Sequence, residues 1–123
     1  ALTMWMALDV VDKKNGCVRY VKGSHKNGLR SHRKTKTLGF SQEISNFGTE
    51  ADRSDDVICS AKPGDLLVHH AMTVHRAEAN TSKMRSRRAL GFIFYGKSAV
   101  EDVEANREYK QKLESELAST GKI

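Results

Sequence analysis

The sequence predicts a mostly β domain, an antiparallel β-sandwich or barrel, followed by one C-terminal α-helix. Two observations favour this fold class: short segments in which apolar and polar residues alternate, and a change to a helical period after Gly96. A third is the absence of the strand–helix–strand pattern that builds a parallel sheet. A chain of 123 residues fits one small domain or a piece of a larger one.

The first predicted strand covers residues 2–8, in which the side chains alternate between two faces. Trp5 lies between Thr3 and Ala7 on one face, so a large aromatic ring has small neighbours. The other face carries only Leu and Met residues. Trp5 is therefore either an ordinary core residue or one wall of a cavity, and both interpretations stay open at this point.

A second strand is predicted over residues 17–21. Asn15-Gly16, just before it, is a dipeptide that readily adopts the positive φ of a tight turn. We therefore expect residues 2–21 to form a hairpin-like unit with a long loop. Further strands are predicted, in chain order, over residues 57–60, 66–70, 73–75 and 87–95.

After Gly96 the periodicity becomes helical. The segment from Ser98 to Glu101 has the pattern of a capping box, in which the serine oxygen and the glutamate satisfy free backbone N–H groups. We predict a helix from there to Gly121, a residue that commonly ends helices. Its apolar residues fall near one helical face and are Val103, Tyr109, Leu113 and Leu117.

The charge of the chain is unevenly distributed around a formal net charge of +6. Residues 30–36 contain four basic side chains and no acid, whereas residues 41–56 contain five acids against Arg53, a net charge of −4. We interpret residues 23–37 as a solvated basic loop, and residues 38–56 match no pattern firmly. A nucleic-acid-binding domain built on the basic segment is an alternative, but no zinc-finger spacing or RNA-binding sheet signature accompanies it. We therefore expect no nucleic-acid partner.

The sequence contains no apolar run long enough to cross a bilayer and does not open with a basic-then-apolar leader. The chain starts directly on strand-like residues, from which we expect an upstream part to be missing. Cys17 and Cys59 are expected to be free thiols in a reduced, cytoplasmic protein without a membrane partner. The composition leaves the oligomeric state open.

Five histidines are present, but no His-x-Asp, His-x-x-x-His or Cys-x-x-Cys spacing forms a complete local metal motif. One constellation nevertheless suggests a binding site. Arg87 opens a predicted strand twelve residues after His75 and shares a strand face with Ala89 and Gly91. A guanidinium in a small-walled cavity suits a carboxylate, because its fork donates two parallel hydrogen bonds. From these residues alone, an ordinary surface charge at Arg87 is an open alternative.

Three segments together resemble the C-terminal half of the phytanoyl-CoA dioxygenase family of iron(II)- and 2-oxoglutarate-dependent oxygenases. They are residues 5–25 (WMALDVVDKKNGCVRYVKGSH), 64–82 (GDLLVHHAMTVHRAEANTS) and 87–95 (RRALGFIFY). The resemblance covers about residues 2–96 and implies a double-stranded β-helix, the jelly-roll or cupin-like fold. Residues 1–123 would then be the C-terminal part of one domain that is incomplete at its N-terminus. Its strands would lie in residues 1–96, and a helix and tail in residues 97–123.

The resemblance also implies roles for three residues. His75 matches the family's third iron ligand, Arg87 matches the arginine that binds the distal carboxylate of 2-oxoglutarate, and Trp5 matches a tryptophan that lines that pocket. The other two ligands of the family come from a His-x-Asp motif, which this sequence lacks. The implied cofactors are Fe(II) and 2-oxoglutarate as cosubstrate, and a role for ascorbate is left open.

The chain departs from the family pattern between its two site residues. The loop from His75 to Arg87 is one residue longer than the commonest form, so Arg85 and Arg88 remain rivals of Arg87. Strand parity favours Arg87, because it shares a face with small residues. Ala77 stands where a small hydroxyl residue is common. His69 and His70, on the strand before the ligand loop, are interpreted as structural residues or as outer partners of the iron ligand. His25 is interpreted as a turn-anchoring residue and His32 as a solvated one.

The reaction implied by the resemblance is hydroxylation of a small organic substrate, coupled to decarboxylation of 2-oxoglutarate to succinate. The basic loop 26–36 hints at an anionic substrate. Two alternatives stay open: a jelly-roll binding domain that has lost its metal, and a related halogenase, in which glycine or alanine replaces the aspartate ligand. The isolated chain is expected to be inactive, because His75 alone supplies one ligand where such sites need three.

Overall fold

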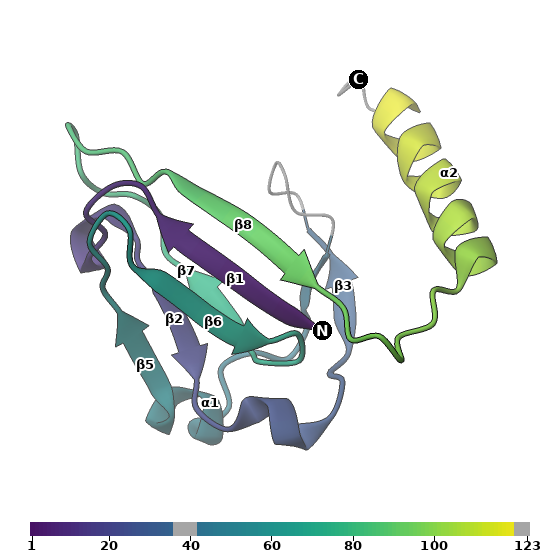
Figure 1. The fold of residues 1–123 in the computed structure, drawn as a ribbon, viewed down its shortest axis with the longest axis horizontal. Coiled ribbons are helices and arrows are strands. Elements are labelled where there is room, and N and C mark those ends of the chain that lie inside the picture. The colour runs from purple at the N-terminus through teal and green to yellow at the C-terminus, as the bar shows by residue number, and fades with distance from the viewer. Residues whose placement is uncertain (36–41, 120–123) are drawn as a thin grey trace.

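The computed structural model describes residues 1–35 and 42–119, which form two facing three-stranded antiparallel sheets, a two-stranded ribbon and two α-helices (Figure 1). In the first sheet, β1 (Leu2–Ala7) lies between β6 (Leu66–His70) and β8 (Ala89–Phe94). In the second sheet, β2 (Val18–Val21) lies between β5 (Asp56–Cys59) and β7 (His75–Ala77). The predicted mostly β domain with antiparallel sheets and a C-terminal helix is confirmed.

β1 is the central strand of the first sheet, and its register fixes which side chains face the second sheet. Trp5 lies opposite Leu67 on β6 and Gly91 on β8. Because successive side chains of a strand alternate, Trp5 and Ala7 share the inner face, as the sequence predicted. Ala7 is fully buried there, whereas Leu2 on the outer face is 44% exposed.

The expected hairpin over residues 2–21 is wrong, because β1 and β2 belong to different sheets (Figure 1). The segment between them, which includes the 3-10 helix η1 (Lys13–Asn15), crosses from one sheet to the other. Along this crossing, Val11 and Ala61 exchange two backbone hydrogen bonds of 2.7 and 2.9 Å. Both strands carry apolar residues on one face, and placing them in opposed sheets buries those residues between the layers.

The buried core sits at the end of the sandwich where this crossing lies. Its members are Ala7, Val11, Cys17 and Ala61, with Trp5 packed against them. Asn15 is fully buried as well, and its Nδ2 donates to the backbone oxygens of Val10 and Ser86, both at 2.9 Å. These two hydrogen bonds tie the crossing to the segment just before β8, which carries Arg87.

β7 begins later than the sequence predicts, because residues 73 and 74 lie between the turn that follows β6 and the first paired residue of β7. The Thr73 N–H donates to the backbone oxygen of the last residue of β6 at 2.9 Å. Ser24, in the 3-10 helix η2 (Ser24–Asn27), is buried, and its hydroxyl accepts from the Val74 N–H at 2.9 Å. The same hydroxyl donates to the end of β2 at 2.7 Å. Buried hydrogen bonds therefore fix the start of β7, where His75 is the first residue.

The segment predicted to be a solvated basic loop instead contains a strand. β3 (His32–Lys34) pairs with β4 (Gln42–Ile44), and residues 36–41 lie outside the described residues. Arg33 donates to Glu43 across this pair at 2.8 Å, and Lys34 forms an ion pair with Glu116 of the C-terminal helix. The oppositely charged segments of the sequence therefore pair with each other in the fold.

Arg30, in the same basic segment, is held by a more buried partner. Its guanidinium donates to the Asp52 carboxylate at 2.6 and 3.2 Å and to the Asn46 side chain at 3.0 and 3.1 Å. Asp52 lies in α1 (Glu50–Ser54), a short helix that the sequence left unassigned, and its side chain is 5% exposed. Thr49 and Asp52 form the capping box that starts this helix.

The C-terminal helix α2 (Val103–Ser119) confirms the predicted helix but not its predicted cap. Asp102 accepts the Ala105 N–H at 3.0 Å and caps the helix, because its carboxylate stands directly before the first turn. Glu101 instead accepts from the Asn106 side chain. The expected end at Gly121 lies outside the described residues. None of the described helices is long and apolar enough to cross a membrane.

Candidate active site

Three aromatic and imidazole side chains meet between the two sheets. Tyr20 on β2 lies directly opposite His75 on β7. The ring of His69 on β6 lies 4.8 Å from the His75 ring and 4.9 Å from the Tyr20 ring, measured between centroids. The Tyr20 hydroxyl and His69 Nδ1 are 3.0 Å apart and share a hydrogen bond. The cluster therefore joins one strand of the first sheet to two strands of the second.

His75 presents one free ring nitrogen. Its Nδ1 lies 2.9 Å from the Thr73 backbone oxygen. A carbonyl oxygen only accepts hydrogen bonds, so Nδ1 carries the proton and Nε2 of the neutral ring keeps its lone pair. This is the usual arrangement of a metal-binding histidine, whose second nitrogen is fixed by a backbone oxygen. The imidazole is exposed, so Nε2 is accessible to a ligand or metal.

The two neighbours of His75 remain neutral. Burial raises the pKa of Tyr20 to about 12, so its phenol stays protonated. Burial, followed by the proximity of His75, lowers the pKa of His69 below its usual value. No pattern in the sequence points to Tyr20. Its place beside His75 depends on the register between β2 and β7, and the residues of the predicted strand 17–21 do not determine that register.

The three candidate arginines differ in their partners. Arg85 binds the Asp12 carboxylate at 2.9 Å with both terminal nitrogens, and Arg88 binds Asp9 at 2.8 Å. Arg87 donates to the backbone oxygen of Gly16, across the gap between the layers. Among the described residues, Arg87 has no carboxylate within ion-pair distance. Arg87 is therefore the one of these three whose guanidinium is available to an added carboxylate.

The wall beside Arg87 is small, as the strand parity predicted. Ala89 lies opposite Ala7, and Gly91 lies opposite Trp5 on the inner face. A Cβ atom built on Gly91 would meet no other atom within 4 Å, so the space over Gly91 is open. The structure thus brings Trp5 and the start of β8 to one side of this space and the strand of His75 to the other.

The remaining histidines lie around the cluster rather than in it. His70 accepts the Met72 N–H through Nδ1 at 3.1 Å, and its ring lies 5.7 Å from that of His25. His32 is exposed on β3. His69 contacts the His75 ring directly, as an outer partner of that residue would.

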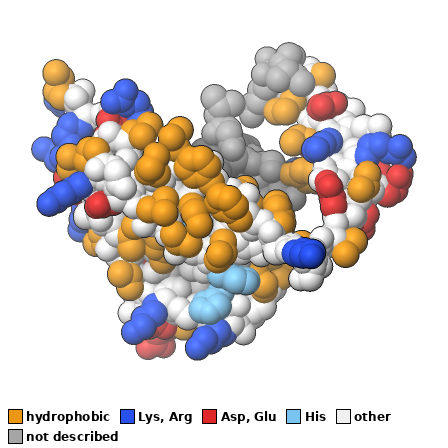
Figure 2. All heavy atoms as spheres, in the orientation of Figure 1, with side chains coloured by type: hydrophobic (Ala, Val, Ile, Leu, Met, Phe, Trp, Pro, Cys, Tyr) orange, Lys and Arg blue, Asp and Glu red, His pale blue; other side chains and the backbone are white. Residues whose placement is uncertain are grey.

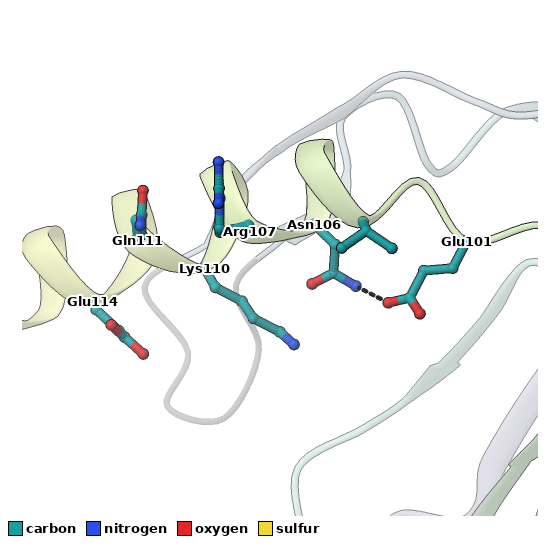
Figure 3. Close-up of a pocket in the computed structure, with 7 residues that line it drawn as sticks. Glu101, Asn106, Arg107, Lys110, Gln111 and Glu114 are labelled. Carbon is teal, nitrogen blue, oxygen red and sulfur yellow. Dashed lines mark hydrogen bonds between the residues drawn. The ribbon is translucent and has the colours of Figure 1, made fainter.

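The described residues hold no group of three or more His, Cys, Asp or Glu side chains close enough to bind a metal. A shallow hollow lies along α2, where the side chains of Asn106, Lys110 and Glu114 project from the helix (Figure 3). None of the residues predicted for the site lines this hollow.

A family model for phytanoyl-CoA dioxygenase (PhyH) matches residues 1–89. The chain belongs to the phytanoyl-CoA dioxygenase family. A probable alpha-ketoglutarate-dependent hypophosphite dioxygenase of Stutzerimonas stutzeri is 30% identical over 102 residues, which are 81% of this chain and 34% of that protein. Phytanoyl-CoA dioxygenase 1 of Oryza sativa subsp. japonica is 34% identical over 87 residues, 71% of this chain and 30% of that protein. The chain spans about a third of the length of these curated relatives.

Solved structures with bound 2-oxoglutarate share the fold. EvdO2 from Micromonospora carbonacea var. aurantiaca, complexed with 2-oxoglutarate, matches with a TM-score of 0.60 and 26% identity over 73% of this chain and 36% of that chain. The epimerase SnoN, complexed with Fe3+, alpha ketoglutarate and nogalamycin RO, matches with a TM-score of 0.53 and 30% identity over 73% of this chain and 32% of that chain.

Proposed function

We propose that this chain is part of an Fe(II)- and 2-oxoglutarate-dependent dioxygenase. The enzyme would hydroxylate a small organic substrate and convert 2-oxoglutarate to succinate and carbon dioxide. The two facing sheets would be part of a double-stranded β-helix. Family membership supports this proposal, as do the 2-oxoglutarate and iron bound in the related structures.

The observation that carries the proposal is the state of Arg87. It reaches from the segment just before β8 toward Gly16, and no carboxylate of the described residues neutralises it, while its neighbours Arg85 and Arg88 both have one. A guanidinium beside open, small-walled space is suited to hold a carboxylate through two parallel hydrogen bonds. Arg87 would bind the distal carboxylate of 2-oxoglutarate, and Trp5 would form a wall of the pocket.

His75 fits the role of one iron ligand. Its Nδ1 proton is fixed on a backbone oxygen, so the lone pair of Nε2 is oriented for a metal. Bound iron would supply the oxygen chemistry, while this chain orients the cosubstrate and shields one side of the site. A site of this kind needs three protein ligands, and the described residues contain no group of three that includes His75. We therefore propose that the other two ligands come from further residues of a longer protein.

Replacement of Arg87 tests the proposal in the protein of family length. Arg87→Ala would leave the distal carboxylate unpaired, a loss of roughly 3–5 kcal/mol for a buried charged pair, or about a hundredfold to a few thousandfold in binding. We expect the KM for 2-oxoglutarate to rise by that factor in succinate-formation assays, with iron content unchanged. Arg88→Ala is the matched control, and its KM should change only modestly. A large defect in Arg88→Ala with a normal Arg87→Ala would reject this assignment.

A further inference from the structure

The inner face of the first sheet carries two polar side chains at the end away from Arg87. Thr3 on β1 shares the face of Trp5 and lies opposite His69 on β6, and we call Thr3 and His69 the polar row. The row of Trp5 lies between the polar row and the segment that carries Arg87. Figure 2 shows the opposite face of the same sheet, over which mainly hydrophobic side chains gather. The polar row is therefore directed into the space between the sheets, where His75 lies.

One ring nitrogen of His69 carries a hydrogen that no described acceptor uses. The Tyr20 hydroxyl and His69 Nδ1 share a hydrogen bond of 3.0 Å, and this hydroxyl has no other acceptor among the described residues. In a neutral imidazole, Nδ1 therefore accepts from the phenol and the hydrogen is on Nε2. In a charged imidazole, both nitrogens carry a hydrogen. Nε2 of His69 is a donor in either case, and it has no partner in the described part of the chain.

The polar row offers hydrogen-bond donors in a space without negative charge. The Thr3 hydroxyl has no hydrogen-bond partner among the described residues. Burial and then His75 lower the pKa of His69, and no described carboxylate contributes to this shift. Ile93, on the other side of Thr3, is 61% exposed and adds an apolar wall. A donor with no acid beside it suits an oxyanion, because hydrogen bonds to ionised acceptors are roughly twice as strong as neutral ones.

We propose that His69 donates a hydrogen bond through Nε2 to an oxyanion of the organic substrate, and that Tyr20 orients the imidazole for this. The site would thereby favour an anionic substrate, with Thr3 as a second donor. In the proposed enzyme Arg87 holds the cosubstrate beyond the row of Trp5, so the polar row is left for the second substrate. This role deepens the proposed function and rests on it. The donor itself can be tested without iron or 2-oxoglutarate.

The hydrogen positions on His69 test the role of Tyr20 in the metal-free, family-length protein. With isotope-labelled histidine, proton–nitrogen correlation NMR at about pH 8, where an imidazole is neutral, distinguishes the two ring nitrogens. We expect the hydrogen on Nε2 of His69. Tyr20→Phe keeps the aromatic ring but should move the Nδ1 signal to that of a nitrogen without a hydrogen bond. A hydrogen on Nδ1, or an unmoved Nδ1 signal in Tyr20→Phe, would overturn the inference.

Inorganic phosphate serves as the oxyanion probe in the same protein. It should shift the Nε2 signal of His69, and calorimetry measures its affinity. We expect His69→Leu to weaken phosphate binding about tenfold or more, because it removes a hydrogen bond to a charged group. His69→Gln, which keeps an N–H donor, should restore most of the affinity. His32→Leu is the matched control, since His32 is exposed on β3, and it should bind phosphate like the wild type. Unchanged affinity in His69→Leu would reject the role of His69.

Two further measurements separate the polar row from the cosubstrate pocket and from the proposed reaction. Excess 2-oxoglutarate should leave the phosphate-induced shift at His69 in place, whereas displacement of phosphate would assign it to the pocket of Arg87 and overturn the inference. Succinate formation is scored on its own in the iron-loaded enzyme. Absence of succinate with the phosphate results intact would count against the proposed function alone. Normal succinate formation with unchanged phosphate affinity in His69→Leu would count against the polar row alone.

Discussion

Two carboxylates determine which arginine near the start of β8 can bind a ligand. Hydrogen bonds from the Arg88 side chain and backbone hold the pKa of Asp9 well below its usual range. The Arg85 side chain lowers the pKa of Asp12 in the same way. Both acids therefore stay ionised at neutral pH and keep their arginines occupied. Arg87 is left available by the pairing of its neighbours, as well as by its own position on the inner face.

At the proposed metal site, one substitution distinguishes the proposed ligand from its neighbour. We expect His75→Ala to weaken Fe(II) binding by more than the roughly 10- to 100-fold that removal of an outer partner costs. His69→Ala should keep most of the iron, because the Nδ1 of His69 is already engaged by Tyr20. Metal analysis of the family-length protein after anaerobic loading measures both. Iron retained in His75→Ala but lost in His69→Ala would show that His69, rather than His75, is the ligand.

The sequence predicted some of the positions of the candidate site residues but not their partners. Alternation along the last strand was enough to place Ala89 and Gly91 on the face of Ala7 and Trp5. It could not show that Arg88 is bound to Asp9, because that contact joins residues 79 positions apart. Tyr20 was missed for the same reason, since its partner on β7 is set by long-range pairing. The roles of His75, Arg87 and Trp5 came from the family resemblance and remain to be tested.

At the scale of single elements, the crossing between β1 and β2 explains the main error of the sequence analysis. A polar stretch ending in Asn15-Gly16 is typical of a turn, and the φ of Gly16 is indeed +81°. A local turn does not determine whether the strands around it pair. Here the fully buried Asn15 binds Ser86, which is 71 positions away, and holds the turn against another segment. Tertiary contacts therefore decided the pairing.

The link between Arg30 and α1 should contribute to stability in a pH-dependent way. Hydrogen bonds from Arg30, and then from the backbone N–H groups of Gly48 and Thr49, hold the pKa of Asp52 well below its usual range. A carboxyl group with a depressed folded-state pKa stabilises the fold above its unfolded value of about 4 and loses that contribution as the pH falls. We expect Arg30→Ala to lower the unfolding free energy by about 2 kcal/mol at pH 7 and by less near pH 2, because the contribution is lost only as the pH falls toward the depressed folded-state pKa of Asp52.

Urea unfolding at the two pH values measures this difference. Arg33→Ala is the matched control, because the Arg33–Glu43 pair is largely exposed and such pairs contribute about 0–1 kcal/mol. An equal loss of stability for Arg30→Ala at pH 7 and pH 2 would mean that packing of the arginine, rather than its charge, stabilises α1.

For the whole molecule, the periodicity of the sequence was enough to predict the class of fold. Short alternating segments gave antiparallel strands, and the helical period after Gly96 gave α2. The order of the strands in each sheet could not be predicted from the sequence, because both sheets are built from strands far apart in the chain. The basic and acidic segments were also misjudged as separate features. Their attraction depends on the pairing of β3 with β4 and of Arg30 with Asp52.

The reactivity of the Cys17 and Cys59 thiols depends on whether the two sheets stay packed together. Cys17 is buried and Cys59 is half-buried, and both are free. Burial raises the pKa of each thiol, so little thiolate forms at neutral pH. We expect slow reaction with a thiol reagent in the native protein and two reactive thiols per chain after unfolding without reductant. Fewer than two after unfolding would contradict the reduced state that the sequence predicted.

Gly16 links backbone shape to the proposed cosubstrate site. A Cβ atom there would collide with the backbone oxygen of Glu78, and its positive φ disfavours any side chain. Its own backbone oxygen is the acceptor for Arg87. A Gly16→Ala variant would shift that acceptor and disturb the arginine with it. In a random-mutagenesis screen, such variants would therefore be rescued by excess 2-oxoglutarate but not by excess iron, although Gly16 has no side chain with which to touch either.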